Sequence, residues 1–199
     1  MVMELWKHLE KYQVILASNS PRRKELLGGL GLEYQVKTLP GIDESYPDNL
    51  PGEEIPVYIA REKAEAYRGQ MKSDEFIITA DTIVWLDGEV MGKPVDEEDA
   101  KRMLRKLSGK THQVITGVCL TTVEEQRSFA TLTDVRFAEL TDEEIDFYVQ
   151  HYKPFDKAGS YGIQEWIGYV GVENIEGSYF NVMGLPVQRL YKELQAWGR

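Results

Sequence analysis

Short apolar runs alternate with amphipathic stretches along this 199-residue chain, and this alternation constrains the fold more than any other feature. The strand-like runs are 14–17, 33–38, 76–80, 113–122, 131–138 and 172–175. Helical patterns begin near Pro21, Pro56, Asp96, Thr141 and Leu185. A chain that alternates strands and helices in this way folds as an α/β protein. We therefore predict a mixed central sheet with flanking helices.

Local signals indicate where several helices and turns begin. Ser20 suits the N-cap of a helix, and Pro21 suits its first position. Thr141, followed three residues later by a glutamate, predicts a capping box. Asp87 with Gly88 is a hairpin turn signal. These signals support the boundaries of the predicted elements.

Two carboxylates are candidates for chemistry. The run 76–80 predicts a buried strand that ends at Asp81, after which residues 82–86 continue extended. Sites in α/β proteins gather at strand ends. Taken alone, Asp81 is more often a turn former or cap than a metal ligand or general base. Glu44 lies in the irregular, glycine- and proline-rich loop 41–52. Together the two could hold Mg²⁺, which takes one or two protein carboxylates plus phosphate oxygens.

Composition excludes several classes of function. The formal net charge is −10, whereas a surface that binds a nucleic acid polymer is usually basic. No apolar run approaches the roughly 20 residues that a membrane helix needs. The single cysteine, Cys119, forbids an internal disulfide. The N-terminus shows no secretory pattern, which together with the single cysteine leads us to expect a cytoplasmic protein. The chain length fits one domain over residues 1–199.

A basic turn is the main candidate for binding an anion. The segment 18–24 holds Ser18, Arg22 and Arg23 where a strand gives way to a helix. Backbone N–H groups and the helix dipole attract anions there, and arginine grips phosphate with two hydrogen bonds. A solvated basic turn is an equal alternative. Lys63 lies on the polar side of its helix, and Lys93 sits in a Gly-Lys-Pro turn that is not a Walker A loop. By itself, Lys63 is expected to be solvent-exposed.

Two further motifs have a structural and a functional interpretation. His112 opens a strand, and no cysteine or serine is arranged as its nucleophile, so we expect a structural histidine. The glycine-rich segment 156–164 ends at Gln164, whose amide can donate to and accept from the edge of a base. The alternative for this segment is a plain surface loop.

These motifs, in this order, resemble the Maf family over residues 14–194. The motifs are Leu16-Ala17-Ser18-Asn19-Ser20-Pro21-Arg22-Arg23, Ala80-Asp81-Thr82, Gly92-Lys93-Pro94, Ser108-Gly109-Lys110-Thr111-His112, Asp156-Lys157-Ala158-Gly159 with Tyr161-Gly162-Ile163-Gln164, and Asn181-Val182-Met183-Gly184-Leu185-Pro186. The resemblance implies a fold like the inosine triphosphate pyrophosphatases, with two lobes around a cleft. It also implies a homodimer that hydrolyses a nucleoside triphosphate substrate between the α- and β-phosphates with a divalent metal cation, Mg or Mn.

The motif variants resemble the dTTP/UTP branch of that family. Another branch, which prefers the triphosphate of 7-methylguanosine, typically has Trp after Ser-Pro in the first motif, has Ser-Asp-Gln in the second, and lacks Tyr-Gly-Ile-Gln. This chain instead has Arg22 after Ser-Pro, Ala-Asp-Thr at 80–82, and Tyr-Gly-Ile-Gln at 161–164. Family roles carry over by position. The proton acceptor is Asp81, the metal ligands are Glu44 and Asp81, the phosphate-binding residues are Ser18, Arg22, Arg23, Lys63 and Lys93, and the specificity residues are Arg22, Thr82 and Gln164. Whether Asp81 takes the proton or chiefly binds the metal stays open. Directly after Gln164 this chain has Glu165 and Trp166, where many relatives have a glycine. This departure concerns the base preference and not the class of reaction.

Two other functions compete with this one. Maf relatives are linked to septum formation, so one alternative is a regulatory or binding protein that restrains cell division through a partner. A pure scaffold has no need for so many charged residues at the motif positions. The other alternative is a house-cleaning enzyme for damaged or modified nucleotides, which differs in substrate only.

Overall fold

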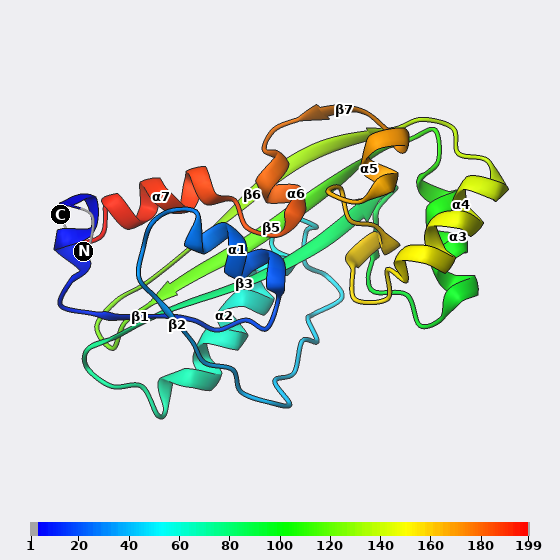
Figure 1. The fold of residues 1–199 in the computed structure, drawn as a ribbon. Coiled ribbons are helices and arrows are strands. Elements are labelled where there is room, and N and C mark those ends of the chain that lie inside the picture. Colours follow the sequence, from blue (N-terminus) through cyan, green and yellow to red (C-terminus); the bar gives the residue numbers. More distant parts are fainter. Residues whose placement is uncertain (1–3, 199) are drawn as a thin grey trace. The chain divides into compact units, whose positions relative to one another are not determined.

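A computed structural model describes residues 4–198 (Figure 1). In chain order the elements are η1 (Glu4–Leu9), β1 (Gln13–Leu16), α1 (Pro21–Gly28), β2 (Gln35–Val36), α2 (Ile55–Arg68), β3 (Glu75–Leu86), β4 (Glu89–Met91), α3 (Glu97–Leu107), β5 (Thr111–Thr121), β6 (Gln126–Phe137), α4 (Asp142–Tyr152), η2 (Ala158–Ser160), α5 (Trp166–Gly171), β7 (Val172–Glu176), α6 (Tyr179–Met183) and α7 (Val187–Gln195). The predicted α/β class is confirmed.

The strands form a mixed sheet with the order β2-β1-β3-β5-β6-β7, and β4 pairs with β3. β1 runs parallel to both β2 and β3, with Ile15 opposite Gln35 and Ile77. The β3–β4 and β6–β7 pairs are antiparallel. Parallel pairs next to antiparallel hairpins give the mixed sheet that the alternation of elements predicts.

The chain divides into two compact units, which are described separately. Unit 1 comprises the residues up to 81, 116–131 and those from 184 onward, and unit 2 comprises 82–115 and 132–183. The long strands β3, β5 and β6 contribute residues to both units. This division agrees with the two lobes that the family resemblance implies.

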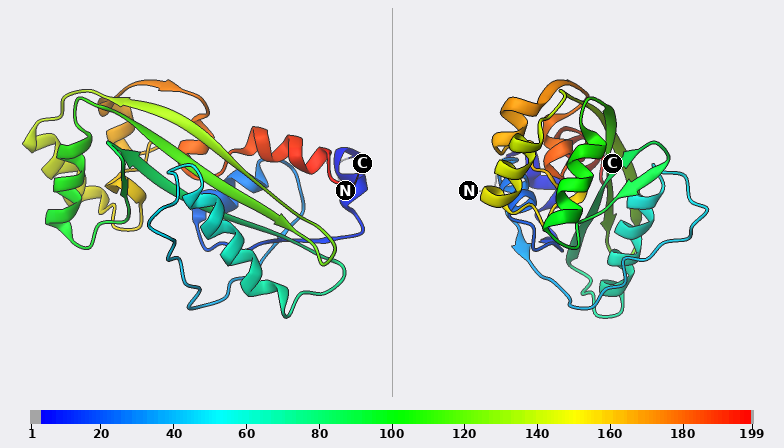
Figure 2. Two further views of the ribbon diagram at one scale, coloured as in Figure 1. Left: turned by 180° about the vertical axis from the view of Figure 1, so that it is seen from behind. Right: turned by 90° about the vertical axis from the view of Figure 1, so that its right-hand side faces the viewer.

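In unit 1, side chains from β3 alternate between two packed faces. Ile77 packs against Ile15 and Tyr67, and Tyr67 belongs to α2. The neighbouring Phe76 meets the ring of Trp197 edge-on, with ring centroids 4.7 Å apart. Since successive residues of a strand point to opposite faces, α2 and the C-terminal segment cover opposite faces of β3. Figures 1 and 2 show α2 and α7 on these two faces.

Helix α2 lies unusually close to β5. A Cβ added to Gly117 would lie 2.3 Å from the carbonyl carbon of Pro56, so only glycine fits there. Further along the helix, Ala60 and Ala64 pack against Cys119, and the Thr79 hydroxyl donates to the Ala60 carbonyl at 2.6 Å. Small residues thus hold α2 directly on the sheet and fix its polar side relative to β3.

Unit 2 has its own buried interior. His112, Phe137 and Tyr161 form a cluster of edge-on rings, with His112 Nε2 2.6 Å from the Tyr161 hydroxyl. Helix α5 packs on the backbone before it, since a Cβ on Gly168 would lie 1.7 Å from the Ile163 carbonyl oxygen. In this unit, α3 and α4 lie side by side (Figure 1).

Several local predictions are confirmed. The Ser20 hydroxyl accepts from the Arg23 N–H, with Pro21 in the first turn of α1. Thr141 and Glu144 form both hydrogen bonds of the predicted capping box. Asp87 and Gly88 make the two-residue turn of the β3–β4 hairpin, both with positive φ.

One predicted boundary is wrong, and one short helix was missed. β3 does not end at Asp81 but continues to Leu86, because its second half pairs with β4 and buries Ile83 and Val84. Asp81 therefore lies in the middle of a strand. The short helix α5 was not predicted, because its glycines obscure the helical pattern and tertiary contacts determine its position. No helix within residues 4–198 combines the length and hydropathy needed to cross a bilayer.

Candidate active site

Lys63 forms the centre of a charged cluster in unit 1. Its Nζ lies 2.8 Å from Glu44 Oε1 and 2.9 Å from Asp81 Oδ1. The Lys63 and Asp81 side chains are only 13% and 14% exposed, whereas Glu44 is 53% exposed. One ammonium therefore bridges two carboxylates, one from a buried strand and one from a loop open to solvent.

The loop that carries Glu44 spans 37–54 and contains no helix or strand. Local bonds shape it, since Asp43 accepts from both the N–H and the hydroxyl of Ser45, at 2.9 and 2.8 Å. Glu44 lies between these two residues. Its position is thus set partly by this turn and partly by Lys63 on α2.

Arg23 is anchored beside this cluster. Its Nε donates to the Gly184 carbonyl at 2.8 Å, and Nη1 donates to the Ala80 carbonyl at 2.9 Å. Burial lowers the pKa of the Arg23 guanidinium, and the nearby Asp81 carboxylate opposes that shift. Arg22 lowers the same pKa further, which places a second cation in the neighbourhood. Both arginines of the first motif thus act on the field around Asp81.

The turn before α1 is tightly bonded. Ser18 is buried, and its Oγ accepts from the Ser20 N–H at 3.2 Å. Ser20 in turn caps α1 through the Arg23 N–H at 3.4 Å. This arrangement orients the first turn of α1, so that Arg22 and Arg23 leave the helix at its N-terminal end.

Unit 2 carries the remaining predicted residues. Thr82 directly follows Asp81 in β3 and is half-buried, and Lys93 is exposed between β4 and α3. The Gly92 carbonyl accepts from the Gly159 N–H at 3.1 Å, which ties the Lys93 turn to the segment before Gln164. The Oε1 atom of Gln164 is buried and has no hydrogen-bond partner among residues 4–198.

The sequence pattern of the Maf-like protein family matches residues 13–197. The chain belongs to the Maf family. A dTTP/UTP pyrophosphatase of Phocaeicola vulgatus is 75% identical to it over 95% of this chain and 98% of that protein. A dTTP/UTP pyrophosphatase of Bacteroides fragilis is 67% identical over 94% of this chain and 97% of that protein.

Among solved structures, a HAM1 protein from Coxiella burnetii is similar to this Maf chain with a TM-score of 0.44 at 16% identity, covering 93% of this chain and 99% of that one. A nucleoside-triphosphatase described as a dITP/XTP pyrophosphatase, from Mycobacterium abscessus, gives a TM-score of 0.41 at 14% identity, covering 64% of this chain and 75% of that one. Scores this low say nothing about the function of the Maf chain.

The prediction that Lys63 is solvent-exposed, made from its place on the polar side of a helix, is wrong. The polar side of α2 does not face bulk water at this position, because Asp81 of β3 lies opposite and accepts from Nζ. The resemblance to the Maf family implied a role for Lys63 that helical spacing alone did not. The expectation of a structural His112 agrees with its burial, and burial lowers its pKa to about 4.

Two backbone acceptors were not found by the sequence reasoning. The carbonyls of Ala80 and Gly184 hold Arg23, and both belong to motifs that had been interpreted through their side chains or as a helix entry. Gly184 has a φ of +117°, a conformation that favours glycine. A glycine directly before Leu-Pro was the available signal for an unusual backbone there.

The donor set suits a hard divalent cation only when substrate oxygens complete it. Glu44 and Asp81 converge on one point, now held by the Lys63 ammonium. Within residues 4–198 no group of three or more acidic, histidine or cysteine side chains could hold a metal by itself. Two carboxylates with room for phosphate oxygens is the arrangement that Mg²⁺ favours in nucleotide enzymes. The residues present therefore fit a metal that binds together with a nucleotide.

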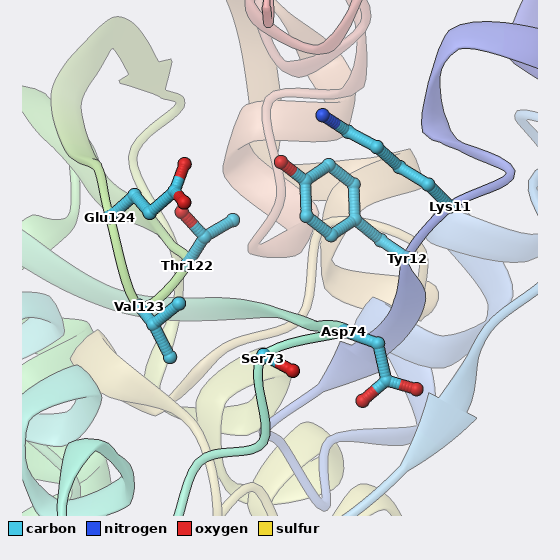
Figure 3. A pocket seen from close by; sticks show the side chains of 7 residues that line it. All are labelled: Lys11, Tyr12, Ser73, Asp74, Thr122, Val123 and Glu124. Carbon is cyan, nitrogen blue, oxygen red and sulfur yellow. The ribbon is translucent and has the colours of Figure 1, made fainter.

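A separate hollow of about 180 Å³ lies in unit 1 (Figure 3). Its lining residues are Lys11, Tyr12, Ser73, Asp74, Thr122, Val123 and Glu124. It adjoins the start of β3 at Glu75, which is about 20 Å along the strand from Asp81. None of the predicted Maf site residues lines it, so the hollow is distinct from the charged cluster.

Proposed function

We propose that this chain is a nucleoside triphosphate pyrophosphatase that hydrolyses dTTP and UTP to the monophosphate and pyrophosphate. Membership of the Maf family and the two dTTP/UTP pyrophosphatases that it resembles support this function. The observation that carries the mechanism is the placement of Lys63 between Glu44 and Asp81, with Arg23 anchored nearby. This is a site with cations for phosphates and carboxylates for a metal and a proton.

In the reaction, a water oxygen attacks phosphorus, and the phosphoanhydride bond between the α- and β-phosphates breaks. The pyrophosphate leaves with the electron pair of that bond, and the water loses a proton. Asp81 is the proposed acceptor of this proton, because its carboxylate sits among cations yet keeps a small exposed surface that water can reach. A positioned carboxylate of this kind typically contributes about 10²–10⁴-fold to a rate.

The triphosphate carries several negative charges, which the site must compensate. Arg23, already fixed by two carbonyls, presents a preorganised guanidinium, and Arg22 lies beside it in the same turn. Lys63 is proposed to bind a phosphate oxygen, and Ser18 lines the turn. Preorganised cations stabilise developing charge without reorganising during the reaction.

Glu44 and Asp81 would hold a divalent cation, Mg²⁺ or Mn²⁺, once phosphate oxygens share its coordination. When bound, such an ion supplies charge neutralisation at the phosphates and orients the substrate. Glu44 can adjust to this role because it lies in an irregular loop and is more exposed than its partner Lys63. The Lys63 ammonium would then move from the carboxylates toward a phosphate.

Three further residues are proposed to take part in recognising the substrate. Lys93 is the proposed additional phosphate ligand, and Thr82 and Gln164 are proposed, with Arg22, to set the preference for the base. The unpartnered Oε1 of Gln164 supports a role in hydrogen bonding to a ligand. We also propose one domain over residues 1–199 and a homodimer, which light scattering after size exclusion would measure.

The decisive experiment measures pyrophosphate release from dTTP, UTP, dCTP, CTP, ATP and GTP, with Mg²⁺, with Mn²⁺ and with a chelator. We expect metal-dependent release that is fastest with dTTP and UTP. Glu44→Gln should raise the metal concentration needed for half-maximal rate, whereas Glu53→Gln, in the same loop, should not. Release from purine nucleotides alone would contradict the substrate assignment. No release from any nucleotide by folded protein would favour the regulatory alternative.

A further inference from the structure

A second charged cluster, in unit 2, surrounds the residue after Gln164. Glu165 accepts a hydrogen bond from the Tyr148 hydroxyl, and its Oε1 lies 3.2 Å from the Lys157 ammonium. Lys157 also binds Asp156 at 2.7 Å. The side chains of Lys157 and Glu165 are only 9% and 19% exposed, and Tyr148 is fully buried. Glu165 is thus held at both carboxylate oxygens.

Residues of this cluster form hydrogen bonds with the backbone of the turn that carries Gln164. The Tyr148 oxygen accepts from the Gly162 N–H at 3.0 Å, and the Glu165 N–H donates to the Gly162 carbonyl at 3.0 Å. The position that a Cβ on Gly162 would take lies 3.0 Å from Glu165 Cδ and 3.2 Å from Gln164 Nε2. The Glu165 carboxylate and the amide nitrogen of Gln164 therefore lie on the same side of this turn.

The charges of the cluster favour one orientation of the Gln164 amide. The negatively charged Glu165 carboxylate lies on the side of the turn that the amide nitrogen of Gln164 occupies. A negative field favours the amide NH₂ on its own side, because a flip would bring the amide oxygen there instead. With the NH₂ turned toward the carboxylate, the buried Oε1 is left as an acceptor without a partner.

The orientation of a glutamine amide decides which pyrimidine it can pair with. Uracil and thymine present an N3–H donor next to an O4 acceptor, whereas cytosine presents an N3 acceptor next to an amino donor. A glutamine that turns freely can match both patterns, since its oxygen accepts and its nitrogen donates. A glutamine held in one orientation matches only one.

We propose that Glu165, held by Tyr148 and Lys157, is a positioning residue that keeps the Gln164 amide in one orientation and so selects uracil and thymine over cytosine. This inference rests on the proposed function, because it requires Gln164 to meet the base. It assigns a role to a residue that stands where many relatives have glycine. Glu165 itself does not touch the substrate in this scheme.

The test compares kcat and KM for UTP and CTP in the wild type, Glu165→Gln and Tyr148→Phe. Each variant weakens the hold on the amide, so the ratio of kcat/KM for UTP to that for CTP should fall roughly tenfold, the scale of one hydrogen bond. The change should come from KM, with kcat for UTP close to that of the wild type. Glu173→Gln is the matched control, since Glu173 is an ion-paired glutamate of the same unit, and should keep the wild-type ratio.

A double-mutant comparison separates positioning from a general structural effect. If Glu165 acts through the amide, Glu165→Gln should not change the ratio further in a Gln164→Ala background. An equal fall of the ratio in both backgrounds would overturn the inference, as would an unchanged ratio in a folded Glu165→Gln or Tyr148→Phe protein. A wild type that hydrolyses UTP and CTP equally well would also overturn it while leaving pyrophosphatase activity intact. A wild type without activity on any nucleotide would instead overturn the proposed function.

Discussion

Among the lysines of residues 4–198 that lie between carboxylates, Lys63 and Lys157 are those for which we propose different tasks. In unit 1, Lys63 lies 2.8 Å from Glu44 and 2.9 Å from Asp81. In unit 2, Lys157 lies 2.7 Å from one carboxylate and 3.2 Å from another. By distance and by burial of the lysine the two arrangements are nearly the same.

The neighbours of the two clusters make the difference. Near Asp81 stand Arg22 and Arg23, so three cations, with Lys63, accompany the two carboxylates. Beside Glu165 stands the Tyr148 hydroxyl, a neutral donor, and burial together with this bond raises the pKa of Tyr148. An excess of cations prepares a site for a polyanion, whereas a closed set of bonds fixes a turn. A lysine between two carboxylates is therefore not by itself a sign of a catalytic site.

The largest expected effect is on catalysis in the first cluster. Asp81→Asn should lower kcat for UTP roughly a thousandfold, because the proposed proton acceptor is lost while the shape is kept. The corresponding change in the second cluster, Glu165→Gln, should leave kcat within about threefold of the wild type. Steady-state pyrophosphate release measures both, with Asp48→Asn as an exposed control. Near-normal turnover by folded Asp81→Asn would show that the first cluster is not catalytic.

The next effect is on stability and should be larger in the second cluster than in the first. Lys157→Met leaves the carboxylate of Glu165, which is 19% exposed, without its cation and should cost about 3 kcal/mol in the free energy of unfolding. Lys63→Met should cost about 1 kcal/mol or less, because Arg23 still compensates Asp81. Urea unfolding at neutral pH measures both. Equal losses would mean that the two clusters do not differ as argued.

The structural features that depend on local sequence signals were predicted correctly. Ser20 and Pro21 start α1, and Thr141 starts α4, because caps depend on residues a few positions apart. The order of motifs, through the family resemblance, also assembled the candidate residues, and four of them meet in unit 1: Arg23, Glu44, Lys63 and Asp81. Patterns that depend on a few adjacent residues were thus the reliable ones.

What the sequence could not provide depends on contacts between distant segments. Lys63 looked exposed because helical periodicity does not show that Asp81 lies opposite it. Asp81 looked like a strand end because the buried apolar run stops at Ala80, whereas 76–80 and the extended residues 82–86 form one strand, β3. Helix α5 is held by the contact of Gly168 with the Ile163 backbone, which no short window of sequence contains.

A smaller effect should follow from moving α2, which carries Lys63. Gly117→Ala places a Cβ 2.3 Å from the Pro56 backbone, so the helix must shift, at a cost of about 2 kcal/mol. The shift should also lower kcat/KM for UTP, since Lys63 moves with the helix. Gly69→Ala is the control, because nothing lies within 4 Å of its added Cβ. Thermal unfolding and pyrophosphate release measure the two consequences, and a Gly117→Ala protein as stable as Gly69→Ala would contradict the close approach.

The smallest effect is a pH dependence that belongs to unit 2. Burial among Phe137 and Tyr161 lowers the pKa of His112 to about 4 from an ordinary value of 6.5, so folding favours the neutral ring. Below pH 6.5 the imidazole binds a proton in the unfolded chain, whereas in the folded chain it does so only near pH 4. The contribution of the neutral ring to the free energy of unfolding is therefore present above pH 6.5 and is lost as the pH falls from 6.5 to about 4. Between pH 7.5 and pH 5.5 the loss should be roughly 1.4 kcal/mol. Urea unfolding at both pH values should show this loss in the wild type and a smaller one in His112→Gln, since the difference between the two proteins isolates the imidazole. If the two proteins lost equal stability, the ring would not be kept neutral by its surroundings, and the interior of unit 2 would be more polar than its aromatic cluster indicates.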